Sequence, residues 1–226
     1  MANEADKRAA ALAAAEEIES GMLIGLGTGT TAAFAIARVG ELVRGGLAVR
    51  AVATSLETER LARAAGIAML DFADVPAIDL CIDGADEIDA RLHAIKGGGG
   101  AMLREKIVAS AALRMVVIAD ASKRVEAIGR AGVPVETLPF ARAFVADRLE
   151  SLGAEVTLRH RGGAPFATDQ NNIILDCAFS AIDDPCRLAD EIARIPGALG
   201  HGLFVSEVDA AYIATNGRVT RQTRPV

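Results

Sequence analysis

The chain has 226 residues, of which 51% are hydrophobic and 24% charged, and its formal net charge at pH 7 is −6. This length accommodates one large domain or two modest ones, with enough apolar side chains for a buried core. The acidic balance, the single Tyr and the absence of Trp argue against a nucleic-acid partner, which would require a basic face. A small phosphorylated ligand remains compatible, because two or three well-placed lysines suffice to bind it.

The cysteines and histidines indicate neither a disulfide framework nor a metal site. The three Cys have no CxxC spacing and the three His are scattered, so we expect reduced thiols, no metal and a cytoplasmic location. Residues 20–37 carry no charge, but glycines and threonines interrupt them and three glutamates precede them. Neither a membrane span nor a signal peptide is therefore expected.

Helices and apolar strands alternate along the first 120 residues. Helices are expected at residues 4–20, 31–43, 56–65 and 101–112. Strands are expected at residues 22–26, 48–53, 67–70, 78–82 and 115–119. This alternation predicts an α/β fold with a Rossmann-like, mostly parallel sheet and helices on both faces.

The pattern changes near Gly132. A short strand between Pro134 and Pro139 is followed by a helix, two strands, a second helix and a final strand. After the first strand these elements are expected at residues 140–152, 154–158, 173–177, 185–194 and 203–205. The β-α-β-β-α-β order predicts a smaller ferredoxin-like α+β domain. We therefore expect a larger domain of residues 1–131 and 207–226 and a smaller domain of residues 132–206. Residues 210–220 are expected to return to the sheet of the larger domain.

The first polar motif is GLGTGTTA, residues 25–32, between a strand and a helix. Glycines and threonines there expose backbone N–H groups at the positive end of the helix, which suits a phosphate. The same residues match the dinucleotide pattern G-x-G-x-x-A, but that pattern expects an acidic residue after the second strand, where Thr54 and Ser55 stand. A sugar phosphate, a nucleotide and a simple tight turn all remain compatible with this motif alone.

The second motif is DGADEID, residues 83–89, directly after a buried strand. Carboxylates at the carboxyl end of a parallel strand lie where open α/β sheets bind ligands, and Asp83 and Asp86 are natural acceptors for sugar hydroxyls. The spacing does not match a calcium loop. A solvated, Asp-rich turn is the alternative.

The third motif is KGGGGAMLREK, residues 96–106. Four consecutive glycines are costly to order, and a flexible linker does not suit a short strand-to-helix connection, so a backbone pocket for a polar ligand is the better explanation. In the following helix, Leu103, Ile107 and Ala111 are expected to share the buried face, with Glu105 away from it. Glu105 then points either to water or into the cleft bounded by the glycines.

The fourth motif is VVIADASK, residues 116–123, in which a strand ends in Asp120 and Ser122 and places Lys123 just beyond the sheet. An ordinary surface lysine would have the same sequence. The four motifs together are more informative than any one, because four separate strand ends carry small or polar residues suited to a polyhydroxy phosphate.

These motifs closely resemble those of the ribose-5-phosphate isomerase A family, in the family's order and near its usual separations. The resemblance extends through TSLETERLA, PVETLPFAR, TDQNNIILD and IPGALGHGLF, so that it covers nearly the whole chain. It implies reversible interconversion of ribose 5-phosphate and ribulose 5-phosphate through a cis-enediolate, without a metal or a nucleotide cofactor. Thr30 and Gly100 depart from the residues common in relatives, Ser and Ala, but keep the character of their positions.

The resemblance also implies site residues. Glu105 corresponds to the general base, and Asp83 and Lys96 are further catalytic candidates. The implied substrate-binding residues are Thr28, Gly29, Thr30, Thr31, Asp83, Gly84, Ala85, Asp86, Lys96, Gly97, Gly98, Gly99 and Lys123. Lys7 falls where family members often have a basic residue near the site.

Two other functions remain possible on the sequence, an NAD-dependent oxidoreductase built on residues 27–32 and a non-catalytic sugar-phosphate sensor domain. The first lacks the expected acidic residue, and the second would not need Glu105. The family commonly assembles as dimers or tetramers, so a homodimer or homotetramer is expected, with a pentose phosphate as the small-molecule partner.

Overall fold

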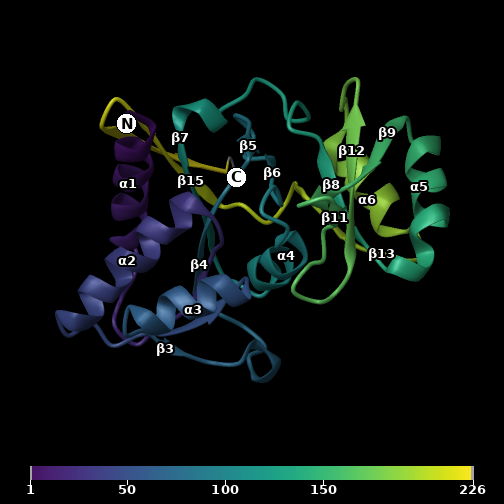
Figure 1. Ribbon diagram of the computed structural model, residues 1–226. Coiled ribbons are helices and arrows are strands. Elements are labelled where there is room, and N and C mark those ends of the chain that lie inside the picture. The colour runs from purple at the N-terminus through teal and green to yellow at the C-terminus, as the bar shows by residue number, and fades with distance from the viewer. Residues whose placement is uncertain (1, 225–226) are drawn as a thin grey trace. The chain divides into compact units, whose positions relative to one another are not determined.

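The computed structural model describes residues 2–224, which form two compact units (Figure 1). The first unit comprises Met1–Ala85, Arg104–Arg124 and Ser206–Val226, and the second comprises Asp86–Leu103 and Val125–Val205. The division falls inside one helix, α4 (Met102–Ser110), after Leu103.

The first unit is built on a seven-stranded sheet. Its strands lie in the order β3 (Ala68–Met69), β2 (Arg50–Ala53), β1 (Leu23–Leu26), β4 (Leu80–Gly84), β7 (Met115–Asp120), β15 (Ala210–Thr215) and β16 (Arg218–Thr223). All neighbouring pairs are parallel except the antiparallel β15–β16 hairpin at one edge. The strand order reverses next to β1, as in doubly wound α/β folds. The expected Rossmann-like sheet is thus confirmed, including the return of the C-terminal segment.

Helices cover both faces of this sheet, as the alternating pattern predicts. On one face, α1 (Ala2–Ala15) and α2 (Thr30–Arg44) share a hydrophobic core with β1, β4 and β7, and α3 (Leu56–Ala64) contributes Ala62 to it. On the other face, α4 packs so closely that a Cβ added to Gly25 would lie 2.6 Å from Val108 Cγ1. Gly25 therefore allows a close helix-to-strand approach that a larger residue would prevent.

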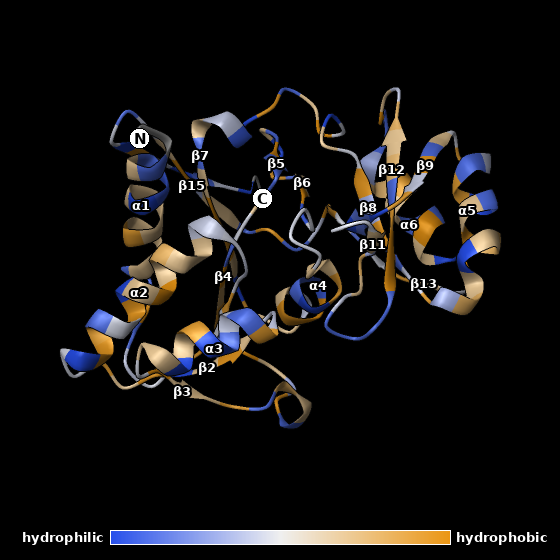
Figure 2. Ribbon diagram, in the orientation of Figure 1, coloured by the Kyte–Doolittle hydropathy of each residue, from blue (hydrophilic) through white to orange (hydrophobic). Residues whose placement is uncertain are grey.

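The second unit contains a four-stranded antiparallel sheet in the order β13 (Ala198–His201), β8 (Val133–Thr137), β12 (Ile173–Phe179) and β9 (Ala154–Leu158). Two helices accompany it, α5 (Arg142–Ser151) and α6 (Pro185–Ala193). This order is that of the ferredoxin-like fold, which confirms the expected class. In Figure 2, β12 is largely hydrophobic, whereas α5 mixes hydrophilic and hydrophobic residues, as expected of a helix packed on one face.

A small three-stranded sheet was not expected from the sequence. It consists of β14 (Leu203–Phe204), β6 (Ala94–Ile95) and β5 (Glu87–Ile88), and it belongs to the second unit. Residues 203–205 were expected as the last strand of the ferredoxin-like sheet, but that strand is β13, and β14 pairs with β6 instead. This pairing also joins residues 86–103 to the second unit, although the sequence assigned them to the larger domain. The remaining short elements are η1 (Phe72–Asp74), η2 (Ala121–Lys123), η3 (Pro139–Ala141), β10 (His160–Arg161) and β11 (Ala164–Pro165).

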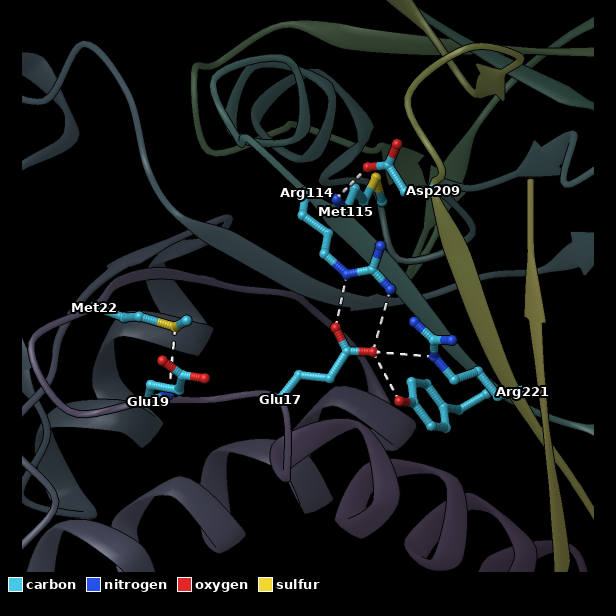
Figure 3. A network of polar contacts seen from close by, with 8 residues as sticks. Glu17, Glu19, Met22, Arg114, Met115, Asp209 and Arg221 are labelled. Carbon is cyan, nitrogen blue, oxygen red and sulfur yellow. Dashed lines mark hydrogen bonds and ion pairs between the residues drawn. The ribbon is translucent and has the colours of Figure 1, made fainter. Parts of the chain in front are cut away.

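The first helix is shorter than its composition suggests. Residues 4–20 were expected to be helical throughout, but α1 ends at Ala15. Beyond it, the Glu17 carboxylate accepts hydrogen bonds from Arg114 Nε at 2.7 Å and from the Tyr212 hydroxyl at 2.7 Å (Figure 3). Arg221 adds a third donor at 3.4 Å. These long-range contacts hold the end of α1 against β7 and the β15–β16 hairpin.

This network predicts a pH-dependent contribution to stability. Burial raises the pKa of Glu17, but its hydrogen-bond donors and their charges outweigh burial, so the pKa lies below its ordinary value of 4.5. A lowered native pKa stabilises the fold above the ordinary value, and this stabilisation is lost as the pH falls through the native pKa. We expect Glu17→Gln to reduce the free energy of unfolding by about 1–2 kcal/mol at pH 7, because charged hydrogen bonds are lost.

Urea unfolding between pH 7 and pH 3 measures this effect, and the difference between wild type and variant is expected to shrink toward acid pH. Glu16→Gln is the matched control, because Glu16 is largely exposed and forms a surface ion pair with Arg38 at 3.4 Å. Equal stability of Glu17→Gln and the wild type at pH 7 would contradict the structural role of this carboxylate.

Candidate active site

Polar loops follow β1, β2, β4 and β7 at the carboxyl edge of the seven-stranded sheet. The four strands are neighbours and parallel, so their carboxyl ends lie along one edge. Open α/β sheets bind ligands at this edge, next to the point where the strand order reverses. Three of the four motifs recognised in the sequence supply these loops within the first unit.

The loop after β1 is held by a cluster of hydroxyl groups. Thr28 Oγ1 lies 2.8 Å from Thr54 Oγ1, 2.9 Å from Ser55 Oγ and 3.1 Å from Thr58 Oγ1. Thr58 Oγ1 also donates to the Gly27 carbonyl at 2.8 Å. The hydroxyl of Thr28 therefore ties its loop to the loop after β2. Sequence reasoning did not assign this supporting role to Thr54, Ser55 and Thr58, although their hydroxyls directly follow a strand.

The exposed part of the β1 loop is Gly29 and Thr30, at the start of α2. A helix N-terminus carries partial positive charge and unsatisfied N–H groups. Lys7 on α1 reaches this position, where its Nζ donates to Thr30 Oγ1 at 3.2 Å. Thr31 follows in the first turn of α2 and is half-buried. Together a cation, a hydroxyl and a helix N-terminus suit an anionic group such as a phosphate.

Asp83 is fully buried at the end of β4 and joins two loops. Its Oδ1 accepts hydrogen bonds from the Thr28 N–H at 3.0 Å and from the Gly84 N–H at 2.7 Å. A Cβ added to Gly27 would lie 2.0 Å from the same oxygen, so Gly27 permits the approach. Gly84 and Ala85 continue from Asp83 and are half-buried.

Glu105 is buried, with 5% of its surface exposed, and lies in the first unit on α4. The end of α4 meets the start of β4, since the Ile78 N–H donates to the Ala111 carbonyl at 2.9 Å. The start of α4 therefore points toward the carboxyl edge of the sheet. Glu105 lies one helical turn closer to that start than Val108, which packs against Gly25.

The expected buried stripe of α4 was wrong. Ile107 is 46% exposed, whereas Met102, Glu105, Val108 and Ala109 are buried. The apolar pattern predicted the opposite face because Leu103, Ile107 and Ala111 are all apolar, whereas the face that is buried includes the charged residue Glu105. The close contact that Gly25 allows determines which face of α4 meets the sheet.

An ion pair fixes the residue after Glu105. Lys106 Nζ lies 2.6 Å from Glu207 Oε1, and both side chains are mostly buried. Burial raises the pKa of Glu207, but the charge and hydrogen bond of Lys106 outweigh it, so the pKa is lowered. The pair holds α4 to the segment before β15. Glu207 was not singled out in the sequence, where nothing relates it to Lys106.

Lys123 ends the short helical turn η2 after β7 and is half-buried. Asp120 starts this turn and accepts a hydrogen bond from the Ser122 N–H at 2.9 Å. The turn places Lys123 next to the carboxyl end of a central strand, as the sequence predicted. The first unit thus carries Thr28–Thr31, Asp83–Ala85, Glu105 and Lys123.

The other candidates belong to the second unit. Lys96 is buried there, its N–H donates to the Gly202 carbonyl at 2.9 Å, and its Nζ lies 5.4 Å from the centroid of the Phe204 ring. The loop after it is attached to Asp86, whose Oδ2 accepts the Gly98 N–H at 2.7 Å. Gly97 is buried, whereas Gly98 and Gly99 are exposed. The second unit thus brings Asp86, Lys96 and the glycines together.

Two further observations concern the part of the chain that the structure describes. Within residues 2–224, no group of three or more His, Cys, Asp or Glu side chains is arranged to hold a metal ion. Over the same range, no helix has the length and apolar character needed to cross a membrane.

The fold and this edge define a doubly wound α/β protein whose parallel strands end in polar, glycine-rich loops. The model of the family described as ribose 5-phosphate isomerase A (phosphoriboisomerase A) matches residues 50–218. The ribose-5-phosphate isomerase A of Sphingopyxis alaskensis is 52% identical over 215 residues, covering 95% of this chain and 94% of the relative. That of Thermomicrobium roseum is 46% identical and covers 100% of this chain and 98% of the relative.

Solved structures agree. The ribose 5-phosphate isomerase of Plasmodium falciparum has a TM-score of 0.94 at 35% identity, covering 99% of this chain and 100% of that one. A D-ribose-5-phosphate isomerase in complex with phospho-erythronic acid has a TM-score of 0.95 at 36% identity, with the same coverage. The chain belongs to the ribose 5-phosphate isomerase A family. The family resemblance and the isomerase class expected from the motifs are confirmed, and neither the oxidoreductase nor the sensor alternative is favoured.

Proposed function

We propose that this chain interconverts D-ribose 5-phosphate and D-ribulose 5-phosphate, a step of the non-oxidative pentose phosphate pathway, with Glu105 as the general base. The observation that carries the proposal is the burial of a carboxylate at the start of α4, in a chain whose family relatives are ribose-5-phosphate isomerases. A glutamate without a specific role would be expected to remain exposed, because burying a charge is costly.

In the proposed reaction, the Glu105 carboxylate removes the proton from C2 of the open-chain aldose. The electrons of the C–H bond form a cis-enediolate, and the same carboxylate returns the proton to C1 to give the ketose. One base thus serves both carbons, and general-base catalysis of this kind typically contributes about 10²–10⁴-fold. Asp83 moves the accompanying proton between O1 and O2 and assists opening of the furanose ring.

The negative charge that develops on oxygen requires fixed donors, which usually supply the larger part of the rate enhancement. Lys96 and the amides of the glycine loop are the proposed donors, with Gly98 acting through the backbone that its bond to Asp86 fixes. Asp83 to Asp86 would bind the sugar hydroxyls. This reaction needs neither a metal nor a nucleotide cofactor.

The phosphate would bind at the edge of the first unit, to the exposed loop after β1 and to Lys123. Support comes from the N-terminus of α2 and from Lys7, whose Nζ donates to Thr30 Oγ1. The hydroxyl of Thr28 already bonds to the loop after β2, so its proposed contribution is to shape the loop. Binding the phosphate far from the reacting carbons orients the substrate.

We also propose that the protein is cytoplasmic and forms a homodimer or homotetramer. Self-association is supported by four exposed apolar side chains of the second unit, Leu138, Phe140, Phe144 and Leu199, of which Phe140 is fully exposed. A second copy is the proposed partner, since α5 carries Phe144 together with charges of both signs, and a surface that binds its own copy must be self-complementary. The cytoplasmic location is supported by Cys186, which is an exposed thiol.

The role of Glu105 is tested by Glu105→Gln. The amide cannot accept the proton, so we expect kcat to fall by at least about 10²–10⁴-fold, with KM changed only slightly because the neutral side chain keeps its shape. Direct assay of ribose 5-phosphate conversion to the ketose measures both constants. Glu126→Gln, at an exposed position, is the matched control. Near-normal turnover of Glu105→Gln would remove Glu105 as the base.

The phosphate role is tested by Lys123→Ala. Loss of the cation is expected to raise KM for ribose 5-phosphate by about tenfold or more, because a charge-assisted hydrogen bond to phosphate is lost. Turnover of unphosphorylated ribose, measured at high concentration, should be unchanged. Arg124→Ala is the control, since Arg124 is an exposed neighbouring cation. Equal impairment with both sugars would exclude a phosphate role for Lys123.

The association face is tested by Phe140→Asp. A buried carboxylate at the centre of an apolar interface is unfavourable, so we expect the variant to sediment as a smaller species than the wild type in analytical ultracentrifugation. Leu113→Asp, at an exposed apolar residue in the first unit, should keep the wild-type assembly. An unchanged assembly state in Phe140→Asp, or a monomeric wild type, would rule out this face.

A further inference from the structure

The glycine-rich loop of the second unit has a backbone that few other residues could adopt. Gly97 and Gly100 have φ angles of 103° and 90°, and the Gly100 N–H closes a turn onto the Gly97 carbonyl at 3.0 Å. Such a loop loses much conformational freedom when it is ordered, so other groups must hold it. Asp86 provides one attachment through the Gly98 N–H.

Arg159 provides a second attachment, although it lies 62 residues after Gly97 in the sequence. Its Nη1 donates to the Gly97 carbonyl at 2.8 Å and to the Gly98 carbonyl at 3.2 Å. Only 16% of its side chain is exposed. The function described above gives Arg159 no role, and no sequence motif drew attention to it.

The guanidinium is itself fixed in place. Its Nε donates to Asp176 Oδ2 at 2.9 Å, and its Nη2 pairs with the other oxygen of the same carboxylate on β12. The main chain of Arg159 is fixed as well, since its N–H donates to the Ile174 carbonyl at 2.9 Å. Two-point pairing of a guanidinium with a carboxylate sets its plane, so that the remaining donor points in one direction. That direction is toward the two glycine carbonyls.

An aromatic ring supports the loop from the same segment. Phe166 packs with Met102 and Ile174, and a Cβ added to Gly100 would lie 2.4 Å from its Cε1. The guanidinium groups of Arg159 and Arg161 lie 6.0 Å and 4.3 Å from the centroid of this ring. Arg161 therefore contacts the same ring as Arg159. Replacing Arg161 removes a cation–ring contact but leaves the bonds from Arg159 to the glycine carbonyls, so it is a matched control.

The two carbonyls that Arg159 contacts belong to particular peptide groups. The Gly97 carbonyl shares its peptide with the Gly98 N–H, and the Gly98 carbonyl shares its peptide with the Gly99 N–H. A cationic donor on a carbonyl polarises the whole peptide and strengthens the N–H on its other side as a donor, by about 10–30% per bond. Arg159 thus acts on the amides of Gly98, which binds Asp86, and Gly99, which is exposed.

We propose that Arg159 is a positioning residue that fixes the Gly97–Gly99 backbone and strengthens the exposed Gly99 amide as a donor to the enediolate oxygen. The inference rests on the proposed isomerase function, and it adds a residue that would not touch the substrate. Asp176 contributes to the same positioning, because it orients the guanidinium of Arg159. The effect on the rate is therefore expected in kcat, where charge on oxygen develops, and not in phosphate binding.

The test compares Arg159→Ala and Asp176→Asn with Arg161→Ala. For Arg159→Ala we expect kcat for ribose 5-phosphate to fall by about 10–100-fold, as for loss of preorganised donors, with KM changed by less than about threefold. The kcat of Asp176→Asn should lie between those of Arg159→Ala and the wild type. The kcat of Arg161→Ala should equal that of the wild type. Inhibition by 4-phosphoerythronate, whose carboxylate resembles the enediolate, should weaken in parallel with kcat in the first two variants. Inhibition by inorganic phosphate should be unchanged.

A purely structural role would lower the amount of folded protein without separating these two inhibitors. Loss of both inhibitors to the same extent, or kcat of Arg159→Ala within twofold of the wild type, would overturn the proposal. Hydrogen exchange of the residue 97–100 amides gives a readout that does not require activity, and it should accelerate in Arg159→Ala but not in Arg161→Ala. If Arg159→Ala does not fold, Arg159→Lys replaces it, since lysine keeps the charge and loses the two-point pairing. A wild type that does not isomerise ribose 5-phosphate would refute the proposed function itself, whereas unchanged exchange would refute only the role of Arg159.

Discussion

The approach of the Asp83 carboxylate to Gly27 is the contact on which the ligand edge of the first unit depends. Asp83 is the penultimate residue of β4, and its Oδ1 accepts a hydrogen bond from the N–H of Thr28 in the loop after β1. The Gly27 N–H also donates to the Ile82 carbonyl, at 2.9 Å. The two strands β1 and β4 are therefore joined near their carboxyl ends. The hydroxyl cluster then joins this loop to the loop after β2. The position of the α2 N-terminus follows from these bonds.

The second constraint is the face that α4 presents to the sheet. Gly25 leaves room for Val108, and the helix turns Glu105 inward one turn earlier. The ion pair between Lys106 and Glu207 attaches the same helix to the segment before β15. The general base proposed for Glu105 would need a fixed direction to act on two adjacent carbons, and these two contacts favour one orientation of the helix.

The architecture was predictable from the sequence because its patterns are local. Apolar strands of four to six residues alternate with helices, and the β-α-β-β-α-β order is read directly along the chain. Contacts between distant residues were not predictable in the same way. The buried face of α4 depends on Gly25, and the end of α1 depends on Arg114 and Tyr212. The two-residue strands β5 and β6 carry no periodic pattern, and the pairing of β6 with both β5 and β14 could not be read from the sequence.

The same distinction applies to the candidate site. Glu105, Asp83, Lys96 and Lys123 could be proposed from the sequence because they stand in short motifs at strand or helix ends. The groups that support them lie elsewhere: Thr58 beneath the β1 loop, Glu207 beside α4, and Arg159 against the glycine carbonyls. None of these three belongs to a motif with a recognisable chemistry, since each acts on backbone or on a neighbouring charge.

The placement of the last two strands determines the order in which the chain can fold during synthesis. The ferredoxin-like sheet is contiguous from β8 to β13, so it can form soon after its own residues have left the ribosome. The larger sheet cannot be completed then, because β15 must pair with β7, and Asp6 on α1 binds the main chain at Asn216 and Gly217. The β7 edge of the first unit therefore stays unpaired until β15 has been translated.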